Sequence, residues 1–202
     1  MESLSRRMEA LLERLRRDPP GPILAAEMEH TLERWRKMLE AEVNAPPIHP
    51  AAPIGSGGGY QVWCDGSCAP NPGPGGWGAL IQHAGQRQEL SGSSPQSTNN
   101  IMELTAAMEA LRRIPPGARI TVTTDSRYLK DGITIWLANW KRRGWRKSDG
   151  EPVLNQPLWQ ALDALIAERT VTFVWVRGHS GHPENERCDE LANQARLAQS
   201  SP

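Results

Sequence analysis

Acidic side chains stand at several positions of this sequence where they could serve one reaction centre. Asp65 follows the alternating stretch Tyr60–Cys64, which is typical of a strand, and it precedes a glycine that is expected to turn the chain. Asp125 follows a second such stretch, Arg119–Thr124. Taken alone, Asp65 is better explained as a turn former, because Asp-Gly is a common turn dipeptide. The further acids downstream reverse that preference.

Glu103 lies in the predicted helix Asn99–Ile114, on the side that should face a sheet. At about 100° per residue it shares that side with Ala107, Ala110 and Ile114. An unpaired buried charge is costly, so an inward carboxylate calls for a partner or a metal ion. The alternative is an acid that happens to stand at the rim of the apolar stripe.

The acids that end the two strands meet if those strands are parallel neighbours. Ligand sites in open sheets form at such carboxyl ends. Asp65, Glu103 and Asp125 would then converge on a small volume, where their mutual repulsion would be severe without a cation. Carboxylate oxygens suit Mg²⁺ or Mn²⁺, which keep water and substrate phosphate in their remaining positions.

Asp189 and His179 are further candidates for the same centre. Asp189 flanks the apolar stripe of a predicted helix, so a solvated surface acid explains it equally well. His179 lies in a polar, glycine-containing loop, and a histidine with a reference pKa of ~6.5 can carry protons. A zinc site of His179, His182 and Cys188 is a rival, but the spacing matches no common zinc pattern and a fourth ligand is missing.

The segment Trp136–Lys147 concentrates positive charge in a chain whose 23 Lys and Arg balance 23 Asp and Glu. It holds five cations and three Trp residues. Cations of this density can neutralise phosphates, and interleaved Trp side chains can pack on sugars or on one another. The alternative is that the Trp residues pack a helical turn and the cations only solvate it.

Elements that could position these residues are predicted in the order β-β-β-α-β-α-α-β-α. The segment Asn71–Gly76 is predicted to be a turn-rich loop. The predicted strands are 60–65, Gly78–His83, Arg87–Ser93, Arg119–Thr124 and Val171–Val176, and the predicted helices are Asn99–Ile114, Ser126–Trp140, Gln156–Glu168 and Glu184–Leu197.

Three regions are predicted along the chain. Residues 1–45 show two amphipathic helical patterns separated by a proline-rich break, which predicts a small helical hairpin. Residues 46–59 are rich in Pro, Ala, Gly and Ser and predict a flexible linker, and residues 60–199 form the main domain. The hairpin is too small a core to stand alone, so it should dock on the main domain, self-associate or hold a protein partner. Its mixed charges make nucleic-acid binding the weaker hypothesis.

Cysteine usage and hydropathy predict a soluble, cytoplasmic protein with no membrane partner. Cys64, Cys68 and Cys188 form no disulfide-like framework, which suits a reducing compartment. No apolar run approaches membrane-spanning length.

From about Tyr60 to Ala198 the chain resembles type 1 ribonuclease H, and its bacterial members in particular. The resemblance covers all of the acids discussed above, and the histidine, in the family's order and spacing. The matching stretches are Asp65–Cys68, Asn71–Gly76, Thr98–Asn100, Met102–Leu104, Thr124–Ser126 and Gly178–Ala192.

The resemblance implies an α/β fold, with a mixed five-stranded sheet and helices on both faces, and an endonuclease that hydrolyses the RNA strand of RNA–DNA hybrids. It also implies a two-metal mechanism with Mg²⁺, or with Mn²⁺ in its place. Asp65 would bridge the two ions, Glu103 and Asp125 would complete the cluster, and Asp189 would hold the ion on the nucleophile side. His179 would shuttle protons or aid product release.

The resemblance further implies where the hybrid binds. Residues of the first strand, the following loop and the start of the Glu103 helix would read the minor groove and its 2′-hydroxyls, which distinguish RNA from DNA. Thr98 and Asn155 would hold a phosphate of the DNA strand. The expected groove residues are Gly66, Ser67, Cys68, Asn71, Asn99, Asn100 and Glu103, and those of the basic protrusion are Trp136, Trp140, Lys141, Arg142, Arg143 and Trp145.

Some positions depart from the family pattern. Cys64 stands where Thr is expected beside the first acid, and Arg127 stands where Gln is frequent, which adds an expected substrate contact. The first 59 residues do not match the hybrid-binding module that some members carry. Two rival functions remain open: a non-catalytic hybrid-binding module, which would have little use for the full set of acids, and an adaptor acting through the N-terminal helices.

Overall fold

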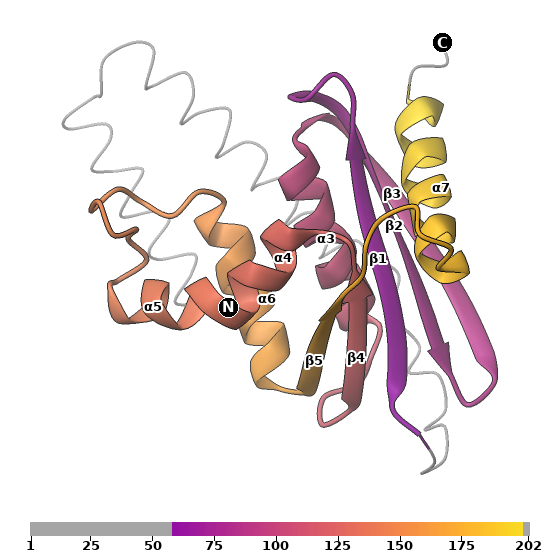
Figure 1. Ribbon diagram of the computed structural model, residues 1–202, viewed down its shortest axis with the longest axis horizontal. Helices are drawn as coiled ribbons and strands as arrows, with labels where there is room; N and C mark the ends of the chain where they lie inside the picture. Colours follow the sequence, from indigo (N-terminus) through magenta and orange to yellow (C-terminus); the bar gives the residue numbers. More distant parts are fainter. Residues whose placement is uncertain (1–57, 200–202) are drawn as a thin grey trace, which may run out of the picture. The chain divides into compact units, whose positions relative to one another are not determined.

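A mixed five-stranded sheet with helices on both faces forms the part of the chain that the structure describes (Figure 1). The structure is a computed structural model, and it describes residues 58–199. The predicted hairpin, residues 1–45, and most of the predicted linker lie outside the described residues. None of the described helices is long and apolar enough to cross a membrane.

The element order agrees with the prediction, and the predicted fold class is confirmed. Strands β3, β2 and β1 are antiparallel neighbours, and β1, β4 and β5 are parallel neighbours. The elements are β1 (Tyr60–Cys68), β2 (Gly73–His83), β3 (Gln86–Ser97), α3 (Asn99–Arg112), β4 (Arg119–Thr124), α4 (Arg127–Asp131), the π-helical η1 (Gly132–Trp136), α5 (Leu137–Arg142), α6 (Gln156–Ala167), β5 (Thr170–Trp175) and α7 (Pro183–Ala198).

The first strands run further than the sequence predicts. Strand β1 continues through Asp65 and Gly66 to Cys68, so the predicted turn at the Asp-Gly pair is wrong. The predicted loop Asn71–Gly76 is also wrong from Gly73 onward, where β2 already pairs with β3. Gly and Pro suggested turns at these places, but several of the glycines serve to let helices approach the sheet. The predicted helix Ser126–Trp140 is helical, but it is divided into α4, η1 and the start of α5.

One close approach is made by α3, which packs on β1 on one face of the sheet. A Cβ at Gly66 would lie 2.3 Å from the backbone nitrogen of Glu103, so only glycine permits this crossing. Val62 and Cys64 of β1 are fully buried in the core on this side. The core also includes Leu104, Leu111 and Trp159 of α3 and α6, together with buried residues of β2 and β4.

The other close approach is made by α7, which packs on β2. A Cβ at Gly78 would lie 2.4 Å from the carbonyl oxygen of Cys188 and 2.7 Å from Cβ of Leu191. Cys188 and Ala192 are fully buried in this contact layer. The two helices that carry Glu103 and Asp189 are therefore held against β1 and β2 by backbone contacts that larger residues would prevent.

Candidate active site

Asp65 on β1 lies beside Asp125, which directly follows the neighbouring parallel strand β4. Trp63 of β1 pairs with Thr123 of β4, and each acid stands two residues further along the same register. Asp65 is only 9% exposed. After burial, the charge of Asp125 is the largest influence that raises the pKa of Asp65. The predicted meeting of these two strand-end acids is therefore what the structure shows.

Glu103 reaches the same place from α3. Its Oε2 accepts a hydrogen bond from Oγ of Ser126, the residue that follows Asp125. The Ser126 oxygen also accepts the backbone N–H of Leu129 at 3.1 Å and so caps α4. The sequence argument did not identify Ser126 as a site residue, although its position between an acid and a helix start is a typical capping signal.

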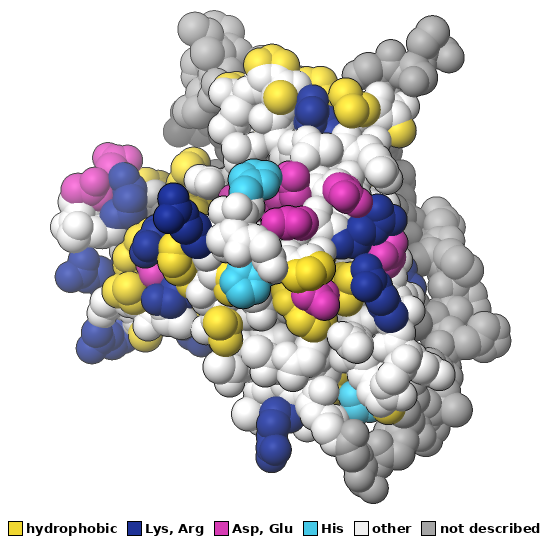
Figure 2. Space-filling view, turned by 45° about the vertical axis from the view of Figure 1, so that its right-hand side comes forward, with side chains coloured by type: hydrophobic (Ala, Val, Ile, Leu, Met, Phe, Trp, Pro, Cys, Tyr) yellow, Lys and Arg dark blue, Asp and Glu magenta, His cyan; other side chains and the backbone are white. Residues whose placement is uncertain are grey.

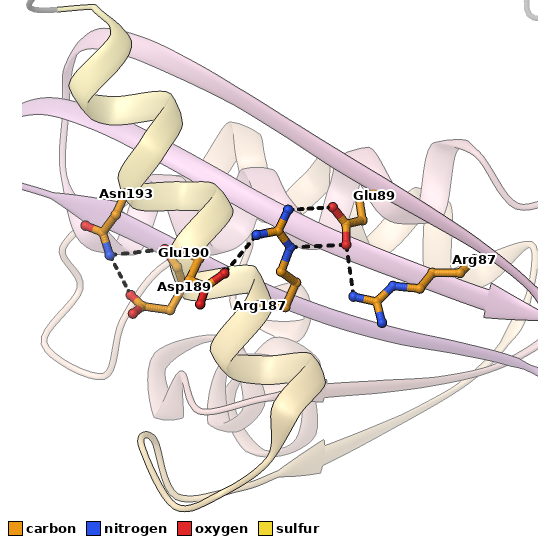
Figure 3. Close-up of polar contacts among 6 residues, drawn as sticks. All are labelled: Arg87, Glu89, Arg187, Asp189, Glu190 and Asn193. Carbon is orange, nitrogen blue, oxygen red and sulfur yellow. Dashed lines mark hydrogen bonds and ion pairs between the residues drawn. The ribbon is translucent and has the colours of Figure 1, made fainter.

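Asp189 joins the group from α7. Asn193, which donates to Asp189, also accepts a hydrogen bond from Ser67, two residues after Asp65 on β1, and the charge of Asp189 raises the pKa of Asp65. Oδ1 of Asp189 accepts a hydrogen bond of 2.8 Å from Nδ2 of Asn193, one helical turn later (Figure 3). The structure thus brings Asp65, Glu103, Asp125 and Asp189 together, and we call these four residues the acid centre. In the space-filling view acidic side chains gather in the middle of one face, beside His side chains (Figure 2).

Burial and mutual repulsion make the acid centre unfavourable for negative charge. Burial, followed by the charge of Asp125, raises the pKa of Asp65 to about 8, against the lowering effect of the Gly66 N–H that donates to its Oδ1 at 2.8 Å. Burial, followed by Asp125, raises the pKa of Glu103 to about 7, although the Ser126 hydroxyl lowers it. A nearby cation would favour the ionised carboxylates and reverse these shifts.

The donor set of the acid centre fits a hard divalent cation in its chemistry, since carboxylate oxygens are the ligands such ions prefer. Within residues 58–199, however, no group of three or more His, Cys, Asp or Glu side chains is arranged to hold a metal ion as it stands. Three of the four carboxylates direct an oxygen to a protein donor instead, namely the Gly66 N–H, the Ser126 hydroxyl or the Asn193 amide. Within the described residues each of these hydrogen bonds engages one oxygen of its carboxylate, so the other oxygen is left for an ion.

The His179 loop passes directly against the acid centre. A Cβ at Gly178 would lie 2.5 Å from Oδ2 of Asp125, and His179 is the next residue. His179 adopts a left-handed backbone conformation with φ of 50°, and its side chain is exposed. The zinc alternative has no support among the described residues, because Cys188 is fully buried whereas His179 and His182 are exposed.

The residues expected to read the minor groove lie around the first turn of α3. Oδ1 of Asn71 accepts a hydrogen bond of 3.3 Å from the backbone N–H of Asn99, and Thr98 caps the helix. Oδ1 of Asn99 is buried without a hydrogen-bond partner in the described part of the chain. The Cys68 thiol donates to backbone carbonyls, including that of Ser97 at 3.3 Å, and so points inward.

The Trp residues of segment 136–147, which we call the aromatic–basic segment, are packed rather than splayed. Ring centroids lie 5.7 Å apart for Trp136 and Trp140, and 5.4 Å apart for Trp140 and the buried Trp159 of α6. Tyr128 of α4 also contacts this cluster, 5.2 Å from Trp159, and its hydroxyl accepts a hydrogen bond of 3.2 Å from Asn155. These Trp residues pack on one another and on Trp159, and their packing holds the segment on the body of the fold.

The cations of the aromatic–basic segment are exposed. Lys141 forms an ion pair of 2.6 Å with Asp163 of α6, a long-range partner that the sequence did not reveal. Arg127, beside the acid centre, lies with its guanidinium 4.1 Å above the ring of Trp175, whose indole N–H donates to the carbonyl oxygen of Asp125 at 2.9 Å. The expected substrate contact of Arg127 thus has a fixed position next to Asp125.

Comparison with known proteins places these features in a family context. The family model described as RNase H matches residues 58–197. A Ribonuclease H of Pelobacter propionicus is 53% identical over 145 residues, which cover 72% of this chain and 89% of that protein. A Ribonuclease H of Halorhodospira halophila is 55% identical over 137 residues, which cover 68% of this chain and 92% of that protein.

Two solved structures share the fold. The crystal structure of LC9-RNase H1, described as a type 1 RNase H with the type 2 active-site motif, is 35% identical with a TM-score of 0.63 and covers 72% of this chain and 76% of that one. The crystal structure of LC11-RNase H1 in complex with RNA/DNA hybrid is 24% identical with a TM-score of 0.54 and covers 70% of this chain and 99% of that one.

Proposed function

This chain belongs to the ribonuclease H family, and from that membership we propose how its own residues perform the family's reaction. The chain is an endonuclease that hydrolyses the RNA strand of RNA–DNA hybrids. The observation that carries the proposal is the acid centre, in which buried Asp65 lies beside Asp125, and the charges of Glu103 and Asp189 from two further elements act on it. A module that only binds hybrids would gain nothing from such a destabilising group of charges.

The four carboxylates of the acid centre are the residues that would hold divalent ions. Mg²⁺ is the ion that we propose, with Mn²⁺ as a substitute, because both prefer carboxylate and water oxygens. In this proposal Asp65, Glu103 and Asp125 would be the central ligands of the ions, and Asp189 would be the ligand nearest the attacking water. When bound, such a pair supplies activation of that water and neutralises the charge that develops on the leaving oxygen.

The proton movements are assigned to His179. Hydrolysis requires that the attacking water lose a proton, that a P–O bond break, and that the leaving oxygen gain a proton. His179 is exposed and follows Gly178, which lies against Asp125, so its imidazole can exchange protons between the acid centre and solvent. The Ser126 hydroxyl holds Oε2 of Glu103 in place during these steps.

Hybrid selection is assigned to the rim of β1 and α3. Ser67, Asn71, Asn99 and Asn100, with the backbone of Gly66 and Cys68, would contact 2′-hydroxyls in the minor groove, which DNA lacks. Thr98 and Asn155 would hold a phosphate of the DNA strand. The cations and Trp residues of the aromatic–basic segment, together with Arg127, would bind further backbone. Contacts of this kind predict weak sequence preference. A protein partner or self-association through residues 1–45 is a further proposal.

The experiment that tests the catalytic assignment replaces Asp65 by Asn. Asp65→Asn should lower magnesium-dependent cleavage of a hybrid by about three orders of magnitude or more, because removal of a group from a cooperating set costs most of the catalysis. Hybrid binding should remain within a few-fold of the wild type. Glu168→Gln is the control, since Glu168 is exposed just after α6 and forms an ion pair with the adjacent Arg169, far from any residue assigned to the reaction.

Double-stranded RNA and double-stranded DNA serve as alternative substrates in the same assay. The wild type should cleave only the RNA strand of the hybrid. Cleavage by Asp65→Asn at the wild-type rate would overturn the metal assignment. Absence of cleavage by the wild type, with hybrid binding intact, would favour the non-catalytic module.

A further inference from the structure

Asp189 is the member of the acid centre with the fewest constraints from the sheet. It projects from α7 and is only partly buried. Asn193, one turn later on the same helix, donates from Nδ2 to Oδ1 of Asp189 at 2.8 Å and to its backbone carbonyl at 3.1 Å. Within residues 58–199 the hydrogen bonds of this carboxylate reach only Oδ1, so Oδ2 is left for a ligand.

The orientation of the Asn193 amide is fixed by the chemistry of its partners. Its Oδ1 accepts from the hydroxyl of Ser67 at 2.8 Å and from the guanidinium of Arg196 at 3.3 Å. Arginine can only donate and an ionised carboxylate can only accept, so the amide oxygen must face Arg196 and the amide nitrogen must face Asp189. The reverse orientation would break the contacts with Arg196 and Asp189, whereas the Ser67 hydroxyl can donate or accept and so allows either orientation.

Asn193 also connects a proposed hybrid-binding residue, Ser67, with a proposed metal ligand, Asp189. Ser67 lies on β1, two residues after Asp65, and its hydroxyl proton is used in the bond to Asn193. The Ser67 oxygen is then free to accept a hydrogen bond, and a 2′-hydroxyl can donate one whereas a deoxyribose cannot. A continuous chain of hydrogen bonds therefore runs from the rim of β1 through Asn193 to Asp189.

We propose that Asn193 is a positioning residue that fixes the Asp189 carboxylate for metal binding and links it to Ser67. This inference rests on the proposed function, because it takes Asp189 to hold a divalent ion. A residue that orients a metal ligand through a hydrogen bond typically changes metal affinity or activity by about 10- to 100-fold when it is removed.

The test measures Mg²⁺ and Mn²⁺ binding to the full chain by calorimetry without any hybrid, so that substrate contacts do not enter. Asn193→Ala should weaken binding by about 10- to 100-fold. The same change in an Asp189→Ala background should cost less than about 2-fold, because coupled residues are not additive. At saturating metal, Asn193→Ala should lower kcat and leave KM for the hybrid nearly unchanged.

Gln199→Ala is the matched control. Gln199 also lies at the end of α7 and donates to the carbonyl oxygen of Gly75 at 2.8 Å, so its loss loosens helix docking without touching Asp189. It should leave metal affinity unchanged. Ser67→Ala gives a second, milder variant, which frees Oδ1 of Asn193 and should weaken metal binding by a few-fold. Thermal unfolding checks that each variant is folded.

The outcomes separate this inference from the proposed function. The positioning role would be overturned if Asn193→Ala weakened metal binding equally with and without Asp189. It would also be overturned if Gln199→Ala weakened metal binding as much as Asn193→Ala does. If Asn193→Ala does not fold, unchanged metal affinity in Ser67→Ala would overturn it. The proposed function is tested separately, by cleavage of the hybrid by the wild type and by Asp65→Asn, whatever Asn193 does.

Discussion

The acid centre and the aromatic–basic segment differ in how well their charges are solvated. In the acid centre, burial and neighbouring carboxylates raise the pKa of Asp65 to about 8 and that of Glu103 to about 7. In the aromatic–basic segment the cations are exposed, and Lys141 already pairs with Asp163 at 2.6 Å. The fold therefore holds unfavourable charge in one region and well-solvated charge in the other.

This difference indicates what each region is built to receive. A buried group of like charges gains most from an ion of opposite sign that enters it, because the ion removes repulsion in a poorly solvated place. Each contact of an exposed cation with a phosphate contributes little, so affinity depends on how many such contacts form. Salt screens these contacts, so the affinity falls as the salt concentration rises. Substitutions should therefore change stability and chemistry in the first region, and affinity and salt dependence in the second.

The largest effect on stability is expected from Asp65→Asn in the metal-free protein. The pKa of Asp65 is raised in the native state from 3.8 to about 8, so its contribution to stability is fully present below about pH 4 and is lost as pH rises toward 8. Asn carries no charge and does not suffer this loss. The variant should thus be more stable than the wild type at neutral pH, by an amount on the order of a few kcal/mol above pH 8.

Thermal unfolding between pH 4 and pH 9 in a chelating buffer measures this effect. The stability gained by Asp65→Asn should grow with pH. Added Mg²⁺ should reduce the difference in stability between the variant and the wild type, because it stabilises the wild type alone. Asp149→Asn provides a control of opposite sign, because the Glu151 N–H and Lys147 lower the pKa of this exposed acid. A gain in stability of Asp65→Asn that does not change with pH would show that packing around Asp65, and not its charge, lowers the stability of the wild type.

Much of the acid centre is predictable from local patterns. The period of two along β1 and β4 places Asp65 and Asp125 on one side of adjacent strands, and the turn of the helix places Glu103 toward the sheet. The Asn193 contact with Asp189 also follows helical spacing, although the residue types alone do not single it out.

Long-range packing accounts for what the sequence does not predict. Gly66 looks like a turn signal, yet it lies inside β1 because α3 approaches there, and at Gly78 the absence of a side chain lets α7 approach β2. The bonds of Ser126 to Glu103 and of Lys141 to Asp163 join elements that only the tertiary fold brings together. Local propensity contains no information on such partners.

A moderate effect is expected in the aromatic–basic segment. Replacing Arg142 and Arg143 by Gln should weaken hybrid binding by about 10-fold at low salt and reduce the slope of log K against log[salt] by about 1 to 2, because each phosphate contact contributes roughly one unit. Lys141→Gln should cost less, since Asp163 already shares its charge. Fluorescence anisotropy with a labelled hybrid at several salt concentrations measures both quantities.

Asp163→Asn should have the opposite effect on hybrid binding from the loss of Arg142 and Arg143. Loss of the acid frees Lys141 for phosphate, so hybrid binding should tighten by a few-fold and its salt slope should steepen. Metal affinity should stay the same in all of these variants, because none of them touches the acid centre. An unchanged salt slope in Arg142/Arg143→Gln would make the segment structural only.

The smallest effect on stability is expected for Glu89, an exposed acid that is paired with arginines, in contrast to the buried and mutually repelling acids of the acid centre. Arg187 on α7 and Arg87 on β3 both donate to Glu89, the closest contacts being 2.9 Å, and they lower its pKa (Figure 3). A lowered pKa contributes stability above the unfolded pKa that is lost as pH falls, which is the reverse of Asp65. Exposed ion pairs contribute little, so Glu89→Gln should lower the unfolding midpoint by about 2 °C or less at pH 7 and by nothing near pH 3. A loss of cleavage beyond about 2-fold in Glu89→Gln, measured with the unfolding midpoint, would contradict this view and would show that the pair positions α7 for Asp189.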